Sequence, residues 1–204
     1  MRPERLVVVV GTHTEVGKTW MSQHLLRRWR DEGLSVAARK PVQSFDAGPS
    51  PTDAALLAAA SSEAIHTVCP ANRWYERAMA PPMASDALGR PRIHLAELVQ
   101  ELRWPAHADV GLVETVGGVL SPVAHDGSSL DLLRLLEPDD VVLVADAGLG
   151  TINAIRLSLQ PLASYRVQIL LNRYEAADEL HRLNAEWLRD RDGLRIALDP
   201  ASLL

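Results

Sequence analysis

The stretch LVVVVGTHTEVGKTW, residues 6–20, decides the fold of this chain, because an apolar run passes directly into a loop that ends in Gly-Lys-Thr. Such a loop between a strand and a helix binds phosphate through its backbone N–H groups and the helix N-terminus. The usual spacing, G-x-x-x-x-G-K-[ST], would place the first glycine at position 12. Here Thr12 occupies that position and Gly11 comes one residue early. The stretch therefore predicts a phosphate site with an unusual loop.

Strand and helix patterns alternate along the rest of the chain. Short apolar runs rich in β-branched residues predict buried strands at 5–10, 35–39, 109–114, 140–146 and 165–172. Helical patterns occupy 19–33, 52–61, 93–104, 153–163 and 178–190, and an irregular connection with a short helix is expected at 62–93. This order predicts an α/β fold of three layers, with a mostly parallel central sheet flanked by helices. Together with the loop, it indicates a P-loop NTPase.

Composition narrows the class of protein. The 204 residues favour one domain, spanning 1–204, and 47% apolar with 23% charged residues is ordinary for a soluble globular chain. A formal charge of −5 argues against a nucleic-acid-binding surface, and the single cysteine, Cys69, is expected to be a small buried residue in a reducing compartment. No stretch has the form of a signal peptide or the length of a membrane span. We therefore expect a cytoplasmic protein that binds neither nucleic acid nor membrane.

Lysine is almost absent from this chain. The 21 basic residues include only Lys18 and Lys40, each just after a predicted strand, and all the others are arginines. Lys18 belongs to the loop and is expected to reach the outer phosphates. Pro41 disfavours helical geometry at Lys40, so we expect its ammonium to point into the crevice beyond the carboxyl ends of the strands. Neither lysine is expected to be part of the core.

Three oxygen-bearing side chains form a candidate magnesium site. Thr19, Asp53 and Glu114 supply a hydroxyl and two carboxylates, ligands that Mg²⁺ accepts alongside water and phosphate. Glu114 ends a predicted strand, where a carboxylate is costly unless a cation faces it. Asp53 has an alternative role, because with Thr52 it could simply cap a helix.

A second anion site is expected where DAGLGTINA, residues 146–154, opens a helix near Thr151. Its backbone N–H groups suit a carboxylate, although an ordinary helix start gives the same pattern. The seven histidines form no H-x-x-x-H pair, and we identify neither a zinc site nor a Ser-His-Asp order.

Several of these motifs together resemble one family, the dethiobiotin synthetases, over residues 6–175. The motifs, in the order and approximate spacing of that family, are GTHTEVGKT, KPVQS, the isolated Asp53, VETVGG, GLGTIN and LLNRY. The family's loop reads G-T-x-T-E-V-G-K-T, with the same early glycine. The resemblance implies a ligase, a cyclo-ligase of biotin biosynthesis that uses ATP and Mg²⁺. Carbon dioxide adds to an amine of 7,8-diaminononanoate, ATP phosphorylates the carbamate, and the second amine closes the cyclic urea of dethiobiotin.

The resemblance also implies a role for each matching residue. Catalytic roles fall to Thr14, Glu15, Lys18 and Lys40. Nucleotide contacts are implied for Thr14, Glu15, Val16, Gly17, Lys18, Thr19, Glu114, Gly117 and Asn172, and metal contacts for Thr19, Asp53 and Glu114. Ser44 would bind the diamine or carbamate. The substrate's far carboxylate would meet Gly150, Thr151, Ile152 and Asn153 in a homodimer.

The chain departs from the family at several positions. The usual E-G-A-G-G is replaced by a segment in which Thr115 and Val116 follow Glu114, which would put bulk near the metal and phosphates. Met83 and Ala154 stand where histidines are common. The segment after residue 190 does not match the family's last adenine-contacting loop.

Two other classes of protein remain open on the sequence. A partition- or carrier-type P-loop ATPase would use ATP as a switch, but its loop carries an extra lysine where this chain has His13. A non-catalytic nucleotide-binding homologue would follow if Thr115 and Val116 spoiled the metal site.

Overall fold

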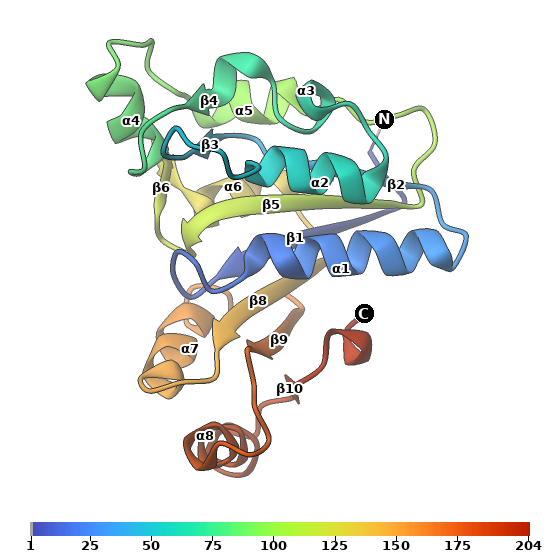
Figure 1. Ribbon diagram of the computed structural model, residues 1–204, viewed down its shortest axis with the longest axis vertical. Helices are drawn as coiled ribbons and strands as arrows, with labels where there is room; N and C mark the ends of the chain where they lie inside the picture. Colours follow the sequence, from blue (N-terminus) through green and yellow to red (C-terminus); the bar gives the residue numbers. More distant parts are fainter. Residues whose placement is uncertain (1) are drawn as a thin grey trace.

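The computed structural model describes residues 2–204 and contains a central parallel sheet of six strands (Figure 1). The strand order is β10-β9-β8-β1-β5-β2. Its strands are β1 (Arg5–Gly11), β2 (Val36–Arg39), β5 (Val110–Gly118), β8 (Asp140–Asp146), β9 (Val167–Asn172) and β10 (Ile196–Ala197). Two short pairs lie outside this sheet: β3 (Gln43–Ser44) with β4 (Trp74–Tyr75), and β6 (Pro122–Ala124) with β7 (Gly127–Ser128). The predicted mostly parallel sheet and all five predicted strands are confirmed.

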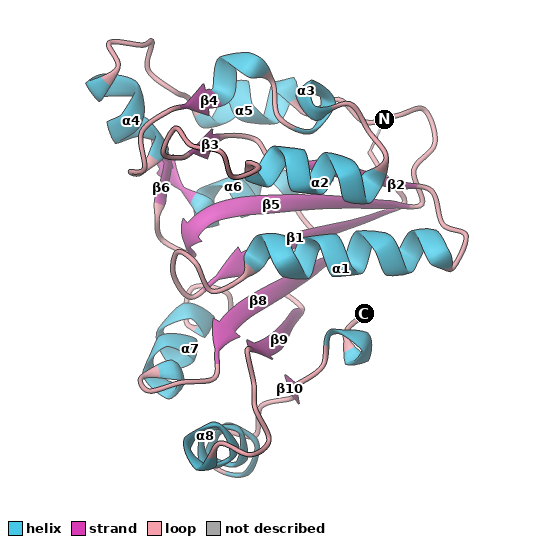
Figure 2. Cartoon of the chain, in the orientation of Figure 1, coloured by secondary structure: helices cyan, strands magenta, loops and turns pink. Residues whose placement is uncertain are grey.

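Helices cover both faces of the sheet (Figure 2). The α-helices are α1 (Lys18–Asp31), α2 (Asp53–Ser61), α3 (Ile65–Val68), α4 (Pro81–Ala87), α5 (Leu95–Glu101), α6 (Ser129–Leu136), α7 (Thr151–Leu159) and α8 (Glu179–Asp190). Two 3₁₀ helices are η1 (Ala71–Arg73) and η2 (Pro200–Ser202). The connection at 62–93 holds more than the expected single short helix, namely α3, η1, β4 and α4. The two-residue strands escaped prediction because so short a run carries no periodic signal.

The valine run of β1 explains why the sheet needs two helical layers. Val7 and Val9 belong to the apolar core shared with α1 and α2, whereas Val8 and Val10 belong to the core shared with α6, α7 and α8. Successive side chains of a strand point to opposite faces, so an unbroken apolar run is stable only when both faces are covered. This places β1, between β5 and β8, at the centre of the molecule.

Within residues 2–204, no helix combines the length and the apolar character needed to cross a bilayer.

Candidate functional site

The predicted phosphate loop lies between the central strand β1 and helix α1. Gly17 is the N-cap of α1 with φ 96°, a left-handed conformation that glycine adopts without steric cost. Lys18 is the first residue of the helix, and its Nζ donates a hydrogen bond to the carbonyl of His13 across the loop at 3.2 Å. The ammonium is therefore folded back over the loop at the N-terminus of the helix.

Close packing explains the early glycine of this loop. A Cβ at Gly11 would lie 2.8 Å from Cγ2 of Val16 and 2.9 Å from the carbonyl oxygen of His13, distances that real Cβ atoms do not tolerate. The Cδ of Lys18 would be only 3.2 Å away. Thr12, by contrast, lies just beyond the end of β1 and still donates its N–H to the carbonyl of Val144 in β8 at 2.9 Å. Glycine is needed one residue early because the loop folds back onto position 11.

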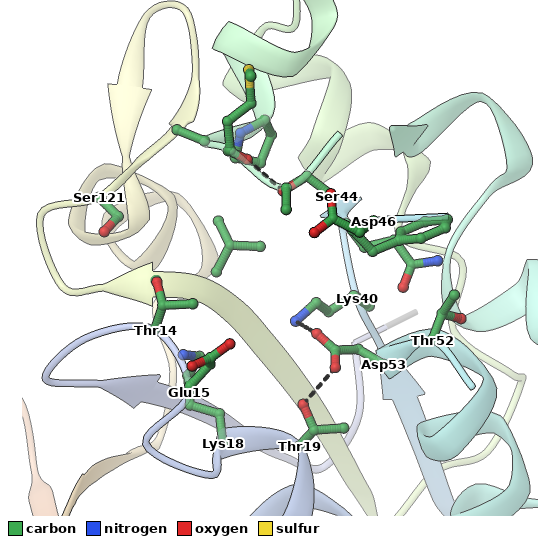
Figure 3. Close-up of a pocket in the computed structure, with 18 of the residues that line it drawn as sticks. Thr14, Glu15, Lys18, Thr19, Lys40, Ser44, Asp46, Thr52, Asp53 and Ser121 are labelled. Atoms are coloured by element: carbon green, nitrogen blue, oxygen red, sulfur yellow. Dashed lines mark hydrogen bonds and ion pairs between the residues drawn. The ribbon is translucent and has the colours of Figure 1, made fainter. Parts of the chain in front are cut away.

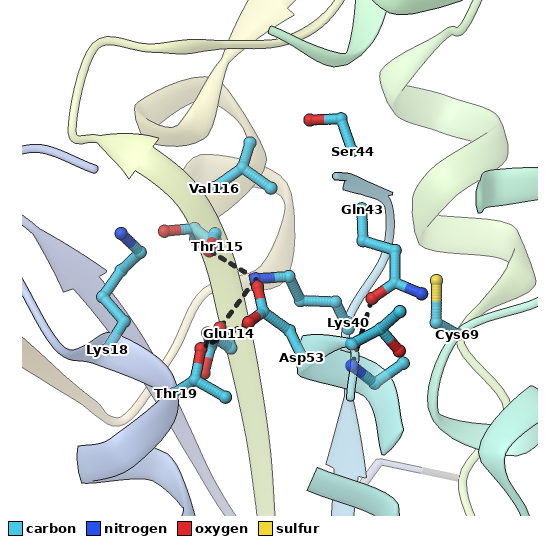
Figure 4. Close-up of polar contacts among 12 residues, drawn as sticks. Lys18, Thr19, Lys40, Gln43, Ser44, Asp53, Cys69, Glu114, Thr115 and Val116 are labelled. Atoms are coloured by element: carbon cyan, nitrogen blue, oxygen red, sulfur yellow. Dashed lines mark hydrogen bonds and ion pairs between the residues drawn. The ribbon is translucent and has the colours of Figure 1, made fainter. Parts of the chain in front are cut away.

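Four polar side chains meet beside the loop (Figure 4): Thr19 from α1, Asp53 from α2, Glu114 from β5, and Lys40, which directly follows β2. Nζ of Lys40 lies 2.6 Å from Oε1 of Glu114 and 2.8 Å from Oδ2 of Asp53. The hydroxyl of Thr19 lies 2.8 Å from the same Glu114 oxygen and 2.9 Å from Oδ1 of Asp53. Glu114 is fully buried, and the cation expected opposite it is Lys40.

The pKa is shifted in opposite directions in the two lysines. Burial alone would lower the pKa of Lys40, but the adjacent Asp53 and Glu114 carboxylates outweigh it and raise that pKa above its usual value. Lys40 in turn lowers the pKa of Asp53. Burial, and then repulsion from Lys40, lowers the pKa of Lys18 to about 8. The expectation that neither lysine is part of the core is wrong, because Lys18 is only 7% exposed and Lys40 only 1%.

Two further expectations about the carboxylates need correction. Thr52, not Asp53, caps α2, since the Thr52 side chain accepts a hydrogen bond from the N–H of Ala55. Asp53 is the first residue of that helix, and its carboxylate turns toward Lys40 instead. Glu114 does not end its strand, because β5 continues to Gly118.

Thr115 and Val116 were both expected to add bulk near the metal and phosphates, but only one of the two side chains points that way. Thr115 is buried, and its hydroxyl donates to the carbonyl of Val9 at 3.2 Å, where the register between β1 and β5 shifts. Its side chain therefore serves the sheet. Val116 alone lines the cavity described next.

The main cavity opens at the carboxyl edge of the sheet and has a volume of about 860 Å³ (Figure 3). Loop and helix residues Thr14, Glu15, Lys18 and Thr19 border it on one side, and Ser44 and Asp46 face them from the other. Cavities of this size accept small-molecule ligands. The other lining residues are Gly17, Lys40, Gln43, Phe45, Pro51, Thr52, Asp53, Ala78, Met79, Ala80, Pro81, Val116, Gly117, Ser121, Pro122 and Arg173.

The predicted magnesium ligands fit such an ion chemically. Thr19, Asp53 and Glu114 present only oxygen atoms, the donors that Mg²⁺ prefers. Oε2 of Glu114 is buried without a hydrogen-bond partner, an unsatisfied acceptor that a cation or its bound water would satisfy. Across the described residues, no group of three histidine, cysteine, aspartate or glutamate side chains is arranged to hold a metal. An ion here would complete its shell with phosphate and water.

Ser44 lines the main cavity, but its hydroxyl proton is already used in a hydrogen bond within the protein. Its hydroxyl donates to the carbonyl of Met79 at 2.6 Å, tying β3 to the segment before α4. A hydroxyl has a single proton, so the oxygen of Ser44 can only accept from a ligand in this arrangement. The Ser44 oxygen therefore suits an amine, which donates N–H, better than a carbamate oxygen, which can only accept.

A smaller side cavity of about 480 Å³ lies on the other side of Gly17. Asn172, at the end of β9, lines it and donates its side-chain N–H to the carbonyl of Val16 at 2.8 Å. The other lining residues are Trp20, Leu170, Leu171, Arg173, Tyr174, Leu198 and Pro200. The side chain of Val16 is packed in the core, so this residue offers a ligand only its backbone.

The predicted carboxylate site at the start of α7 lies apart from both cavities. Gly150, Thr151, Ile152 and Asn153 line neither of them. Thr151 is 3% exposed, and its hydroxyl donates to the carbonyl of Asp146 at 2.7 Å. Asn153 is exposed on the first turn of the helix.

Several cavity residues escaped the sequence analysis. Asp46, Ser121 and the segment 78–81 carry no motif of their own, and only their place in the fold brings them to the main cavity. Arg173 had a usable signal, because it directly follows Asn172 at the carboxyl end of a predicted strand.

Solved structures of similar fold support the P-loop NTPase architecture. A putative plasmid partition protein from Borrelia burgdorferi, solved bound to AMPPNP, superposes with a TM-score of 0.57 at 13% identity, covering 96% of this chain and 85% of that chain. Chloroplast FtsY from Physcomitrella patens gives a TM-score of 0.50 at 17% identity, covering 96% of this chain and 57% of that one. At these identities the similarity establishes the fold alone.

Sequence relatives are more specific. The model of an AAA domain family matches residues 5–191. The ATP-dependent dethiobiotin synthetase BioD of Rhodococcus jostii is 38% identical over 78% of this chain and 68% of its own length. The enzyme of the same name from Anaeromyxobacter dehalogenans is 36% identical over 86% of this chain and 79% of its own length. The one from Brachyspira hyodysenteriae is 26% identical over 94% of this chain and 90% of its own length. With these relatives, and with the loop, both lysines and Asp53 lining one cavity, this chain belongs to the ATP-dependent dethiobiotin synthetase family.

Proposed function

We propose that this chain is a ligase that carboxylates 7,8-diaminononanoate and closes its ring to dethiobiotin, at the expense of ATP. The observation that carries the proposal is that Lys18, Lys40 and Asp53 line one cavity at the carboxyl edge of the sheet, with the buried Glu114 bound to Lys40 behind them. A reaction that joins a phosphorylated carbamate to an amine needs a phosphate site and an amine site side by side, and the residues that line the main cavity support this proposal.

The loop side of the cavity would hold the triphosphate. Phosphoryl transfer is promoted chiefly by positioning and by fixed positive charge. Lys18 and the loop N–H groups supply that charge at the N-terminus of α1, and Thr14 and Glu15 border the same space. Thr19, Asp53 and Glu114 would hold Mg²⁺, which neutralises charge developing on the phosphates.

Lys40 would hold the carbamate against the γ-phosphate. Its pKa is raised by the flanking carboxylates, so it remains an ammonium at physiological pH. In the proposed reaction an amine nitrogen bonds to the carbon of CO₂ and loses a proton. A carbamate oxygen then attacks the γ-phosphorus, with ADP leaving. The second amine attacks the carbonyl carbon and loses a proton, and phosphate leaves with the oxygen.

The opposite wall of the cavity would hold the diamine. The oxygen of Ser44 accepts hydrogen bonds and so suits an amine N–H, as argued above. Gly150 to Asn153 line neither cavity of their own chain, so their proposed role in binding the substrate's far carboxylate requires a second copy. We therefore propose a homodimer, acting in the cytoplasm on small molecules rather than on nucleic acid or membrane.

Product formation tests this function directly. Purified protein would be incubated with MgATP, bicarbonate and 7,8-diaminononanoate, and dethiobiotin measured by mass spectrometry with ADP and phosphate. We expect all three products, and no dethiobiotin when the diamine is omitted. ATP hydrolysis without dethiobiotin would instead indicate a switch ATPase of the partition or carrier type. ATP binding without turnover would indicate a non-catalytic homologue.

A further inference from the structure

Arg173 occupies the junction of the two cavities. It directly follows Asn172, the last residue of β9, and its side chain is exposed. It lines both the main cavity and the side cavity, and among residues 2–204 Gly17 of the phosphate loop is the only other residue that does so. A ligand that bridges the two cavities at this junction would therefore lie beside both residues.

The guanidinium of Arg173 is held over the phosphate loop. Its Nη2 donates to the backbone carbonyl of Glu15 at 2.9 Å. Over residues 2–204 this is its only hydrogen bond, and no carboxylate pairs with it. A guanidinium carries five N–H donors in a planar fork suited to phosphate oxygens. Most of that capacity remains available at the mouth of the loop.

Both residues of the hydrogen bond between Arg173 and Glu15 have an unusual backbone conformation. Arg173 has φ 56° and Glu15 has φ 64°, so two non-glycine residues joined by one hydrogen bond both adopt the left-handed region. Such conformations cost free energy in residues with a Cβ, and they persist where the surrounding structure requires them, as at ligand clamps. Here they bring the end of β9 and the phosphate loop together.

The walls of the cavities indicate which part of a nucleotide passes Arg173. The side cavity has aromatic and apolar walls, from Trp20, Tyr174, Leu198 and Pro200, which suit a planar base. The main cavity holds the charged groups expected to meet the outer phosphate. The inner phosphates would then lie at the junction.

We infer that Arg173 contacts the α- and β-phosphates of the bound nucleotide and clamps them against the phosphate loop. This inference rests on the ATP site of the proposed function, but not on the identity of the second substrate. Lys18 and Lys40 serve the outer end of the triphosphate, whereas Arg173 supplies the cation for its inner end.

Substitution by asparagine tests the clamp without straining the backbone. Asparagine tolerates left-handed conformations better than most residues, so Arg173→Asn removes the charge while keeping the local fold. The matched control is Arg182→Asn, at an exposed arginine of α8 outside both cavities. Titration calorimetry would measure the affinities for ATP and ADP, and a competition titration would measure the affinity for adenosine. The melting temperature of each variant would report on its folding.

We expect Arg173→Asn to weaken the binding of ATP and of ADP by similar factors. Each Kd should rise about tenfold or more, as expected for the loss of a charge-assisted hydrogen bond. Adenosine affinity and the melting temperature should change little, Arg173→Lys should recover part of the loss, and Arg182→Asn should match the parent. Unchanged ATP and ADP affinities would overturn the inference. A loss of affinity confined to ATP would also overturn the inference, because it would place Arg173 at the γ-phosphate. An equal loss of affinity for adenosine would overturn it as well.

The parent protein separates this inference from the proposed function. A parent that binds ATP and ADP but makes no dethiobiotin would refute the ligase proposal, and the phosphate clamp would still be judged by the Arg173 variants. A parent that binds no nucleotide would overturn both.

Discussion

Nζ of Lys40 lies 2.6 Å from Oε1 of Glu114, and both side chains are buried. Lys40 directly follows β2 and Glu114 belongs to β5, and these two strands are neighbours in the parallel sheet. A buried carboxylate is costly to leave unpaired, so the lysine is both a structural partner of Glu114 and a cation at the cavity. The two roles can be separated by substitution.

Replacing Lys40 by methionine should destabilise the fold. Lys40→Met leaves Glu114 buried without its cation, and breaking a buried pair in this way costs about 3–5 kcal/mol. Urea denaturation at pH 7 would measure the change in the free energy of unfolding. The double variant Lys40→Met/Glu114→Gln should recover part of the loss, because the amide carries no charge. Equal losses in the single and double variants would contradict this explanation.

Nucleotide affinity should fall as pH rises through about 8. The pKa of Lys18 is lowered to about 8 by burial and by Lys40, and its protonated form is the one that attracts phosphate. Below that pH the ammonium is already formed, whereas above it binding must take up a proton. The Kd for ATP should therefore rise by up to about tenfold per pH unit above 8, measured by calorimetry between pH 7 and 9.

Lys18→Arg is the control for this pH dependence, since arginine stays charged throughout that range. We expect weaker binding overall, because the wider guanidinium fits the loop poorly, but a much flatter profile. The same steep profile in the arginine variant would assign the titration to another group.

Gly11→Ala should damage the phosphate loop. The new Cβ would lie 2.8 Å from Val16 and 2.9 Å from the His13 carbonyl, so the loop must shift. Overpacking of this kind costs about 1–3 kcal/mol of stability, and we expect ATP affinity to fall with it. Gly48→Ala is the matched control, because its nearest neighbour would be 3.9 Å away. Denaturant melts and ATP titrations on both variants check the prediction, which fails if the two behave alike.

Asn153→Glu tests the proposed carboxylate site at the start of α7. Asn153 is exposed on the first turn, where an added negative charge would compete with the substrate's carboxylate. We expect a higher KM for the diamine with little change in the Kd for ATP. Leu157→Glu adds the same charge to an exposed position farther along the helix and should have little effect. Thr151 is unsuitable for this test because its side chain is buried.

Local patterns in the sequence were enough to predict most of the architecture. The valine run of β1, the loop of 11–19 and the alternation of strands with helices predicted the parallel sheet, and five strands are found where expected. The two-residue strands and the make-up of 62–93 were not predicted, because contacts rather than periodicity define them. The roles of the candidate site residues remain proposals, but the structure does bring Thr19, Lys40, Asp53 and Glu114 together.

The sequence by itself determined the fold class, the phosphate loop and the family, because each depends on residues close together in the chain or on motifs in a fixed order. Only the tertiary structure decided that Lys40 is buried between Asp53 and Glu114, that Thr115 faces β1, and that Arg173 stands where two cavities meet. Those relationships join residues far apart in the chain. They depend on strand register and on the direction of each side chain, which are set when distant elements pack together.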